Sequence, residues 1–349
     1  EPTKFNLVKS LKGTGPKVVT VDAYDKKAIR QVMKDALKAA ENNEFVVVVV
    51  EGLCVKKAHP STKESRISID PDICQRCDHC QICPGTERTG EDTPFFNNLC
   101  SGCGGESPSC LQMCPYKAMS LNEAGKGGGA KITFPEPPPI EPVQLDQLSL
   151  PERMSLAIRG VGGQGALFFG KVMTELAFLS GFGEKNIVKG ETHGMSQMGG
   201  PVISTFSCGT VHSPVLYPGS ADALIAMESS EVLRPGFLEL LKPKGTILLS
   251  KTQIVPTIIK ADEYPSAEMI QSEIGKFNIV NIDALQVALD IGDTTGRIAN
   301  VVLIGALSIL APFNEFPKSL WMEAIAKVSP NPNIWAANYS AFKAGRELI

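Results

Sequence analysis

Eight of the ten cysteines lie between Cys74 and Cys114, and their spacing constrains this stretch more than any other feature of the chain. The first run reads C-x2-C-x2-C-x2-C-P and ends at Pro84, and the second reads C-x2-C-x6-C-x3-C-P and ends at Pro115. Thiols at this density are either paired in disulfides or bound to metal. Short C-x2-C steps that end in Cys-Pro are typical of iron–sulfur clusters. The stretch therefore predicts a small module, similar to bacterial ferredoxins, that holds two [4Fe–4S] clusters.

The spacing also assigns ligands to each cluster. In two-cluster modules the cysteine before the proline of each run binds the other cluster. This rule gives Cys74, Cys77, Cys80 and Cys114 to cluster 1, and Cys83, Cys100, Cys103 and Cys110 to cluster 2. Two spacings depart from the usual pattern, because two residues precede Cys83 where three are usual, and six precede Cys110 where two are usual. Of the eight assignments, that of Cys83 to cluster 2 therefore depends most on the rule that the cysteine before proline binds the other cluster.

Zinc and disulfides are the alternatives for the same cysteines. Two zinc ions with four thiolates each would also use eight cysteines. The third cysteine inside each run and the Cys-Pro endings favour clusters. The chain opens with no export signal, so we expect a reducing cytoplasm, where disulfides are rare. A net charge of −3 and the lack of long apolar runs predict neither a nucleic-acid surface nor a membrane span.

The residues before the cysteines predict a partial βαβ unit, which we place at 1–62. Lys17–Asp22 and Phe45–Val50 are strand-like, and apolar positions from Lys26 onward recur at helical spacing after a capping Asp25. A continuous apolar strand such as Phe45–Val50 is typical of a parallel sheet covered on both faces. Two strands and one helix cannot supply that cover. We therefore expect this unit to dock onto more sheet, from a missing segment or from a partner subunit.

Three further segments follow: the cluster module at 63–125, a Gly/Pro-rich linker at 126–153, and an α/β domain at 154–349. Alternating strands and helices in the last segment predict a three-layer domain with a mostly parallel sheet. The expected strands are Ser155–Arg159, Val202–Ser207, Ala223–Met227, Thr246–Leu249 and Ile279–Asn281. The expected helices are Ala166–Ser180, Glu228–Leu241, Ala284–Ile291, Asn300–Leu310 and Pro317–Val328.

Two loops of the α/β domain are candidate binding sites. The first has Gly160, Gly162, Gly163, Gln164 and Gly165 between a strand and a helix, an arrangement that brings backbone N–H groups close to a phosphate. Close packing of helix on strand would also explain some of these glycines. A dinucleotide site would need an acidic residue at the end of the next strand, for which Glu184 and Glu191 are the candidates. An electron carrier that binds a flavin or a nicotinamide nucleotide in this domain is therefore the alternative function.

The second loop runs from Gly190 to Pro201 and contains His193 and Gln197. Polar, glycine-rich loops on a rigid sheet often line functional sites. His193 and Gln197 are candidate interface or catalytic residues, although His193 taken alone fits a hydrogen-bonded structural role better than a catalytic one.

Several motifs together resemble the 2-oxoacid:ferredoxin oxidoreductases, and among these the indolepyruvate enzymes. The domain at 154–349 is similar to their gamma- or beta-type subunits through Gly160-Val-Gly-Gly-Gln-Gly165, Glu191-Thr-His-Gly-Met-Ser-Gln197, Gly199-Gly-Pro-Val202, Ala221-Asp222 and Arg297-x-x-Asn300. The first half resembles the end of their alpha subunit, which comprises the tail of a thiamine-diphosphate domain and a two-cluster module.

The resemblance implies an oxidative decarboxylation that yields an acyl-coenzyme A. Thiamine diphosphate and Mg²⁺ would be held by an alpha-type partner subunit in a hetero-oligomer, coenzyme A would be a co-substrate, and ferredoxin would take the electrons. The family's Gly-Asp-Gly thiamine motif is absent from this sequence, so the chain alone would not be the complete enzyme. Met198 also replaces an arginine that the family often has in its second loop.

Overall fold

The computed structural model describes residues 6–52, 67–77, 79–80, 85–87, 93–96, 108–121, 134–145, 148, 150–183, 186–191, 200–255, 263–293 and 296–349. The chain divides into two compact units, Glu1–Gly127 and Gly128–Ile349, and the division falls within the glycine run of the predicted linker. No helix among the described residues is long and apolar enough to cross a membrane.

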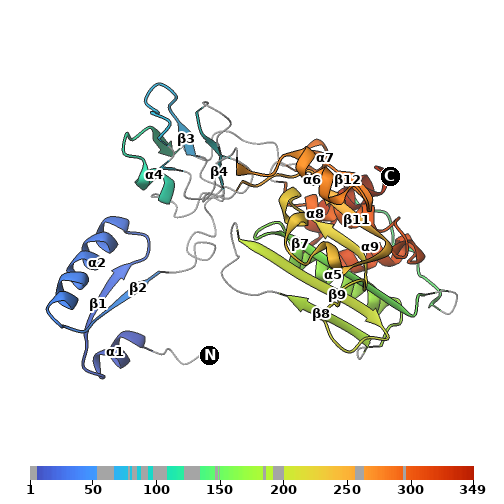
Figure 1. Ribbon diagram of the computed structural model, residues 1–349, viewed down its shortest axis with the longest axis horizontal. Helices are drawn as coiled ribbons and strands as arrows, with labels where there is room; N and C mark the ends of the chain where they lie inside the picture. The colour runs from blue at the N-terminus through green and yellow to red at the C-terminus, as the bar shows by residue number, and fades with distance from the viewer. Residues whose placement is uncertain are drawn as a thin grey trace. The chain divides into compact units, whose positions relative to one another are not determined.

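The first unit begins with the expected βαβ arrangement (Figure 1). Helix α1 (Leu7–Lys12) precedes β1 (Lys17–Asp22), α2 (Lys26–Glu41) and β2 (Val46–Glu51). The two strands are parallel, with Val19 opposite Val48. Asp25 caps α2, because its Oδ1 accepts the Ala28 N–H at 2.9 Å. Helix α2 lies along the strand pair, but none of its residues is fully buried.

The cysteine module of the first unit is closed by a short antiparallel ladder. Strands β3 (Ile67–Ile69) and β6 (Met119–Leu121) lie on either side of the cysteine stretch, and Ser68 Oγ and Ser120 Oγ are 2.9 Å apart. Between them lie β4 (Thr86–Glu87), β5 (Phe95–Phe96) and the short helix α4 (Ser109–Met113). The buried core of this module consists of Ile67, Cys80, Cys110 and Met119.

The second unit is built on a six-stranded sheet in the order β12-β11-β10-β7-β9-β8. Strands β7, β10, β11 and β12 are parallel, and β9 runs antiparallel to both β7 and β8. The expected mostly parallel sheet is thus confirmed. The strands are β7 (Arg153–Val161), β8 (Ile187–Glu191), β9 (Pro201–Gly209), β10 (Ala221–Ala226), β11 (Leu241–Ser250) and β12 (Asn278–Ile282).

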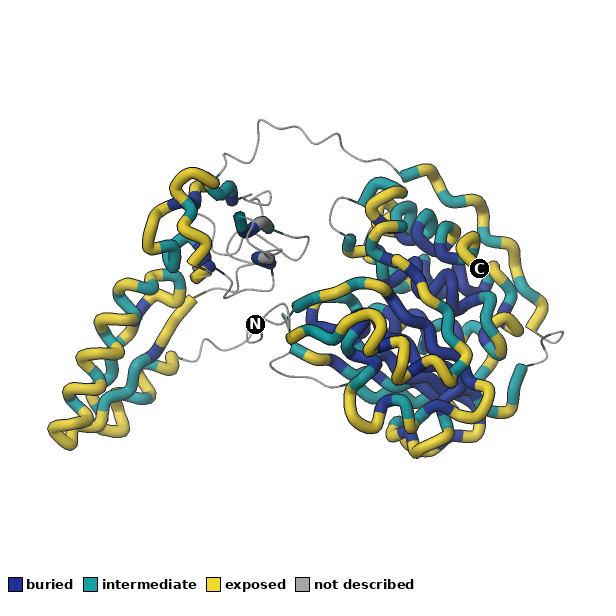
Figure 2. Tube along the Cα trace, turned by 45° about the horizontal axis from the view of Figure 1, so that its top comes forward, coloured by how far each residue is buried: buried dark blue, intermediate teal, exposed yellow. Residues whose placement is uncertain are grey.

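Helical layers of unequal thickness cover the two faces of this sheet (Figures 1 and 2). Alternate residues of one strand serve opposite faces, since Leu156 and Ile158 enter one apolar cluster and Ala157 enters the other. The larger cluster packs under α5 (Ala166–Leu179), α7 (Ala284–Asp290), α8 (Ala299–Leu307), α9 (Lys318–Val328) and α10 (Pro332–Arg346). The smaller cluster packs under η3 (Ser229–Leu233), η4 (Leu238–Leu240) and α6 (Ala267–Ile274), and a further turn, η6 (Phe313–Glu315), precedes α9.

The proline-rich part of the predicted linker contacts the second unit. The partly buried apolar side chains that pack against its larger cluster include Phe134, Ile140, Val143, Leu148 and Leu150. Apolar residues at intervals between the prolines therefore fasten this extended segment to the domain that follows it.

One predicted helix is wrong, and several elements were not predicted. Glu228–Leu241 forms the separate turns η3 and η4 and then enters β11, because Pro235 and the left-handed Gly236 (φ +79°) interrupt any longer helix. Strand β8 contains Gly190, which weakens its strand signal. Helix α10 begins with Asn331 as cap and Pro332 at its first turn, a start signal that is readable in the sequence.

Candidate functional site

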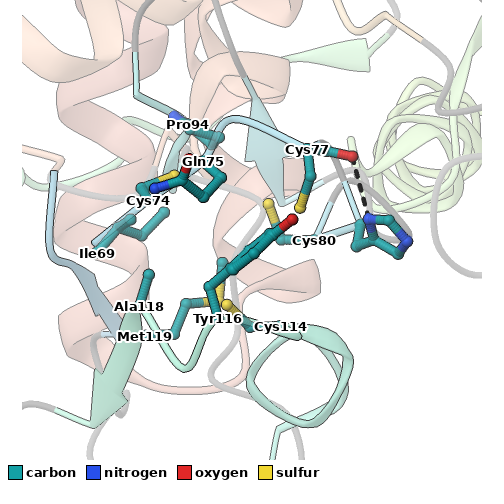
Figure 3. A pocket seen from close by; sticks show the side chains of 11 residues that line it. Ile69, Cys74, Gln75, Cys77, Cys80, Pro94, Cys114, Tyr116, Ala118 and Met119 are labelled. Carbon is teal, nitrogen blue, oxygen red and sulfur yellow. Dashed lines mark hydrogen bonds between the residues drawn. The ribbon is translucent and has the colours of Figure 1, made fainter. Parts of the chain in front are cut away.

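Four thiols of the first unit line a single pocket: Cys74, Cys77, Cys80 and Cys114 (Figure 3). These are the four residues that the sequence assigns to cluster 1. Three come from the first run, and Cys114 follows α4 forty residues after Cys74. The fold thus brings Cys114, at the end of the second run, to the same pocket as three cysteines of the first run.

Local backbone contacts hold these cysteines in place. Asp70 starts the turn before Cys74, because its Oδ1 accepts the N–H of Asp72 at 2.9 Å and its carbonyl accepts the Cys74 N–H at 3.0 Å. Cys114 ends α4 and its N–H bonds to the Leu111 carbonyl. The β3–β6 ladder joins the segment before Cys74 to the segment after Cys114.

The donor set and the lining of the pocket fit an iron–sulfur cluster. The other lining residues are mainly apolar, with Ile69, Pro94, Ala118 and Met119 among them, and Tyr116, Gln75 and His79 complete the lining. Four thiolates on one zinc ion would lie about 3.8 Å apart, given Zn–S bonds of about 2.3 Å. Among the described residues, no group of three or more candidate ligands is arranged to hold one metal ion. In a cubane each thiolate binds a different iron, so four thiols that line one pocket are the donor set that such a cluster needs.

Only part of the second predicted ligand set can be placed. Cys110 is buried on α4, in the same small core as Cys80. Cys83, Cys100 and Cys103 lie outside the described residues, as do His193 and Gln197 of the second candidate loop.

The glycine loop of the second unit joins β7 to α5 at the carboxyl end of the parallel strands. The Gly162 N–H bonds to the Gly200 carbonyl at 2.8 Å. The side chain of Gln164 spans the loop, since its Oε1 accepts the Val161 N–H at 2.7 Å and its Nε2 donates to the Met227 carbonyl at 2.8 Å. Gln164 thereby ties the loop to the end of the neighbouring strand β10.

Glycine is required at two positions of this loop for different physical reasons. Gly163 has φ +105°, a left-handed conformation with nothing within 4 Å of an added Cβ. Gly165 also has a positive φ, and an added Cβ there would lie 2.3 Å from Asn300 Nδ2. Close packing therefore accounts for Gly165, as the structural alternative anticipates, whereas the conformation of the loop accounts for Gly163.

Helix α5 begins at this loop without a side-chain cap. Its N-cap is Gly165, and no side chain of the described residues bonds to the first turn. The N-terminus of such a helix carries unpaired N–H groups and partial positive charge. Asn300, at the start of α8, is buried beside it and donates to the Gly165 carbonyl at 3.4 Å. This corner of the sheet is thus chemically suited to an anionic group.

A buried carboxylate organises the neighbouring segments of the same sheet edge. Glu228 follows β10 and is fully buried. Its Oε2 accepts from Ser230 N and Oγ and from Glu231 N, and its Oε1 accepts from Ile254 N and the Tyr264 hydroxyl. Burial raises the pKa of Glu228, while the hydrogen bonds act in the opposite direction. No sequence signal links Tyr264 or Ile254 to Glu228, so sequence reasoning missed this network.

Among the residues that the structure describes, the acidic residue expected of a dinucleotide site is not found beside the loop. Glu191 ends β8, which lies two strands from β7 on the far side of β9, and its carboxylate is 2.7 Å from Lys189 Nζ. Glu228, after the adjacent strand β10, uses both oxygens within the protein. Glu184 lies outside the described residues. Among the residues described, the nicotinamide alternative therefore lacks its ribose ligand.

Comparison with known proteins places the second unit in a family. The model of the pyruvate ferredoxin/flavodoxin oxidoreductase family matches residues 155–348. The indolepyruvate oxidoreductase subunit IorB of Archaeoglobus fulgidus is 33% identical over 159 residues, covering 44% of this chain and 76% of that protein. The subunit of the same name from Methanothermobacter thermautotrophicus is 28% identical over 170 residues, covering 48% and 83%.

Two solved structures align with part of this chain at lower identity. The pyruvate oxidoreductase subunit PORC of Thermotoga maritima aligns with a TM-score of 0.43 and 21% identity, over 56% of this chain and 97% of that one. The 2-oxoglutarate:ferredoxin oxidoreductase of Magnetococcus marinus aligns with a TM-score of 0.41 and 18% identity, over 57% and 31%. Through residues 155–348, the chain belongs to the pyruvate ferredoxin/flavodoxin oxidoreductase family.

Proposed function

We propose that this chain is the iron–sulfur subunit of a thiamine-diphosphate-dependent 2-oxoacid:ferredoxin oxidoreductase. The observation that carries the proposal is the convergence of Cys74, Cys77, Cys80 and Cys114 on one pocket, in a chain whose second unit belongs to this family. These four thiols would hold one [4Fe–4S] cluster. Cys83, Cys100, Cys103 and Cys110 would hold the second.

The proposed reaction is the oxidative decarboxylation of a 2-oxoacid. One 2-oxoacid, one coenzyme A and two oxidised ferredoxins give one acyl-coenzyme A, CO2, one proton and two reduced ferredoxins. When bound, the clusters would accept the two electrons of the oxidation one at a time and pass them to one-electron carriers. The residues of this chain hold the clusters, shield them with apolar side chains and position the module in the complex.

Indolepyruvate, or a related arylpyruvate, is the proposed substrate. The support is the name shared by the two relatives that align with about half of this chain, both of them indolepyruvate oxidoreductase subunits. An aromatic 2-oxoacid would be oxidised in a reducing cytoplasm, on thiamine diphosphate and Mg²⁺ held by an alpha-type partner.

The βαβ unit supports the need for such a partner. Valines fill β1 and β2, yet only Val21 and Val49 of these strands are buried. On α2 and before β2, Leu37 is 62% exposed and Phe45 is 74% exposed. Parallel strands with this composition are normally covered on both faces. We infer that the thiamine-binding subunit supplies the missing sheet and helices.

The glycine loop is the proposed contact for the anionic part of coenzyme A. The support is the uncapped N-terminus of α5 next to a loop that keeps Gly163 left-handed. Substituting Gly165 would test this poorly, because the clash with Asn300 would disturb packing. Leu167 is a better position, since it lies in the first turn of α5 and is 41% exposed.

Leu167→Glu should raise the Michaelis constant for coenzyme A several-fold in the reconstituted complex. An acidic residue in the first turn stabilises a helix by up to about 1 kcal/mol, so the fold should not suffer, but it repels an anion bound there. Leu167→Gln is the uncharged control. Equal Michaelis constants for coenzyme A in both variants and the wild type would contradict the proposed contact.

Analysis of the purified chain distinguishes the proposed function from the electron-carrier alternative. Anaerobic preparations should contain iron and sulfide, and should co-purify with a thiamine-binding chain. A flavin absorption band, or bleaching of the cluster absorbance by NADH, would support the alternative. Zinc without iron would contradict both the proposed function and the electron-carrier alternative.

A further inference from the structure

Thr86, in the cysteine module, carries a buried hydroxyl that has no hydrogen-bond partner among the described residues. The residue is only 6% exposed, so bulk water does not reach this hydroxyl. Buried hydroxyls in native proteins are almost always hydrogen-bonded, because an unpaired hydroxyl loses its bonds to water and gains none in return. The orphaned hydroxyl of Thr86 therefore points to an acceptor other than the described protein groups.

Strand preference alone does not account for threonine at this position. Thr86 opens the short strand β4, and β-branched residues favour strands. Valine has nearly the same shape and the same strand preference, and it would leave no hydroxyl unpaired. The reason for a hydroxyl must therefore lie in what the side chain faces.

The register of the β4–β5 pair fixes the direction in which Thr86 faces. Thr86 lies directly opposite Phe96 in this antiparallel pair. Side chains of directly opposed residues lie on the same face of the two strands. Phe96 packs against the small core that contains Cys80 and Cys110. The Thr86 hydroxyl therefore lies on the face of the strand pair that is turned toward the cysteines.

Position in the sequence and in the fold both favour cluster 2 as the neighbour of this hydroxyl. Thr86 follows Cys83 by three residues, and the ligand rule assigns Cys83 to cluster 2. Cys110, assigned to the same cluster, belongs to the core against which Phe96 packs. Thr86 is not among the described residues that line the cluster 1 pocket, whereas Pro94, just before β5, is one of them.

We propose that the Thr86 hydroxyl donates a hydrogen bond to a sulfur of cluster 2 and thereby raises the reduction potential of that cluster. The inference rests on the part of the proposed function that places two [4Fe–4S] clusters in this module. A hydrogen-bond donor stabilises the reduced cluster, which carries one more negative charge, more than the oxidised cluster. Cluster 2 gains one electron on reduction, and the hydroxyl keeps its proton.

The test compares Thr86→Val, which removes the hydroxyl and nearly keeps the shape, with Thr86→Ser, which keeps the hydroxyl. The full chain, loaded with iron and sulfide, is titrated with dithionite and redox mediators, without a 2-oxoacid or a partner subunit. Electron paramagnetic resonance records the potential of each cluster. In Thr86→Val the equilibrium constant for adding one electron to one of the two clusters should fall about tenfold, which is about 59 mV.

Two variants should leave both potentials at their wild-type values. Thr86→Ser keeps the donor. Thr20→Val changes an exposed threonine of β1 in the same unit and is the matched control. Unchanged potentials in Thr86→Val, with about eight irons per chain, would overturn the inference and leave the proposed function intact. Zinc in place of iron in the wild-type chain would instead contradict the proposed function.

Thr86→Ala separates the hydroxyl from packing if Thr86→Val loses a cluster. A loss of about four irons in both variants, with full iron in Thr86→Ser, would support the contact, because alanine and serine both lack the methyl group and differ in the hydroxyl. Full iron and unchanged potentials in Thr86→Ala would overturn it.

The assignment to cluster 2 is tested in a Cys80→Ser background, where cluster 2 alone should remain. The potential of the remaining cluster should still fall when Thr86→Val is added. A remaining cluster that does not respond to Thr86→Val would overturn the assignment to cluster 2.

Discussion

Strands β2 and β10 have similar apolar composition but very different surroundings. Every residue of β10 is buried between two helical layers, whereas Val49 alone is buried in β2. Figure 2 shows the same contrast between the units, with buried residues concentrated in the second. Composition sets the preference for a parallel strand, but cover must come from other segments. The second unit contains its own cover, and we infer that the first relies on clusters and a partner.

The largest effect that we expect is a difference between serine substitutions at two buried cysteines, one from each unit. Cys80→Ser should lower iron from about eight to about four atoms per chain and abolish ferredoxin reduction. Cys208→Ser, in β9, should keep all iron and cost about 1–3 kcal/mol of unfolding free energy, because it buries a hydroxyl in an apolar core. Iron analysis and thermal unfolding measure both. Full iron in Cys80→Ser would contradict the ligand assignment.

The next largest effect should be a difference in thiol reactivity between the two units. Burial, with a smaller contribution from Asp222, raises the pKa of Cys208 to about 12. At pH 8.5 its thiolate fraction is then about a thousandfold below that of an ordinary cysteine. After iron removal, iodoacetamide should label Cys77 and leave Cys208 unmodified, as read by peptide mass spectrometry. Equal labelling of Cys208 in folded protein would show that the second core is open.

A matched pair of leucines compares packing in the two units, and its α2 member should give the smallest effect on stability. Leu176→Ala removes a fully buried side chain of α5 and should cost about 2–5 kcal/mol in the unfolding of the second unit. Leu37→Ala on α2 should change the stability of the isolated chain by less than about 0.5 kcal/mol. In the complex, the same α2 variant should weaken association by about 1 kcal/mol. Urea unfolding and subunit titration give the two numbers, and an α2 variant without effect on association would argue against docking there.

The sequence predicted local features well where one residue type dictates the geometry. Asp25 caps α2 as expected, and five valines predict β2 within one residue. The ligand rule grouped Cys114 with Cys74, Cys77 and Cys80, and these four side chains line one pocket, although their binding of a cluster stays a prediction. In the first two cases the decisive information is close in sequence, and in the third it is the regular spacing of the cysteines.

Features that depend on distant contacts could not be predicted. The Glu228 network joins residues up to 36 positions apart, and Gln164 and Asn300 owe their positions to strand and helix ends brought together by the sheet. Helix propensity also misled at Glu228–Leu241, where Pro235, Gly236 and burial of Glu228 together impose short turns. Propensity is a weak guide wherever tertiary contacts decide the backbone.

The most direct test of the central claim follows electrons into this chain. The chain is reconstituted anaerobically with its thiamine-binding partner and mixed with indolepyruvate and coenzyme A in the absence of ferredoxin. We predict about eight irons and eight sulfides per chain, and cluster signals in electron paramagnetic resonance that develop only when the 2-oxoacid is present. Clusters that stay oxidised under these conditions, or zinc in place of iron, would contradict the account.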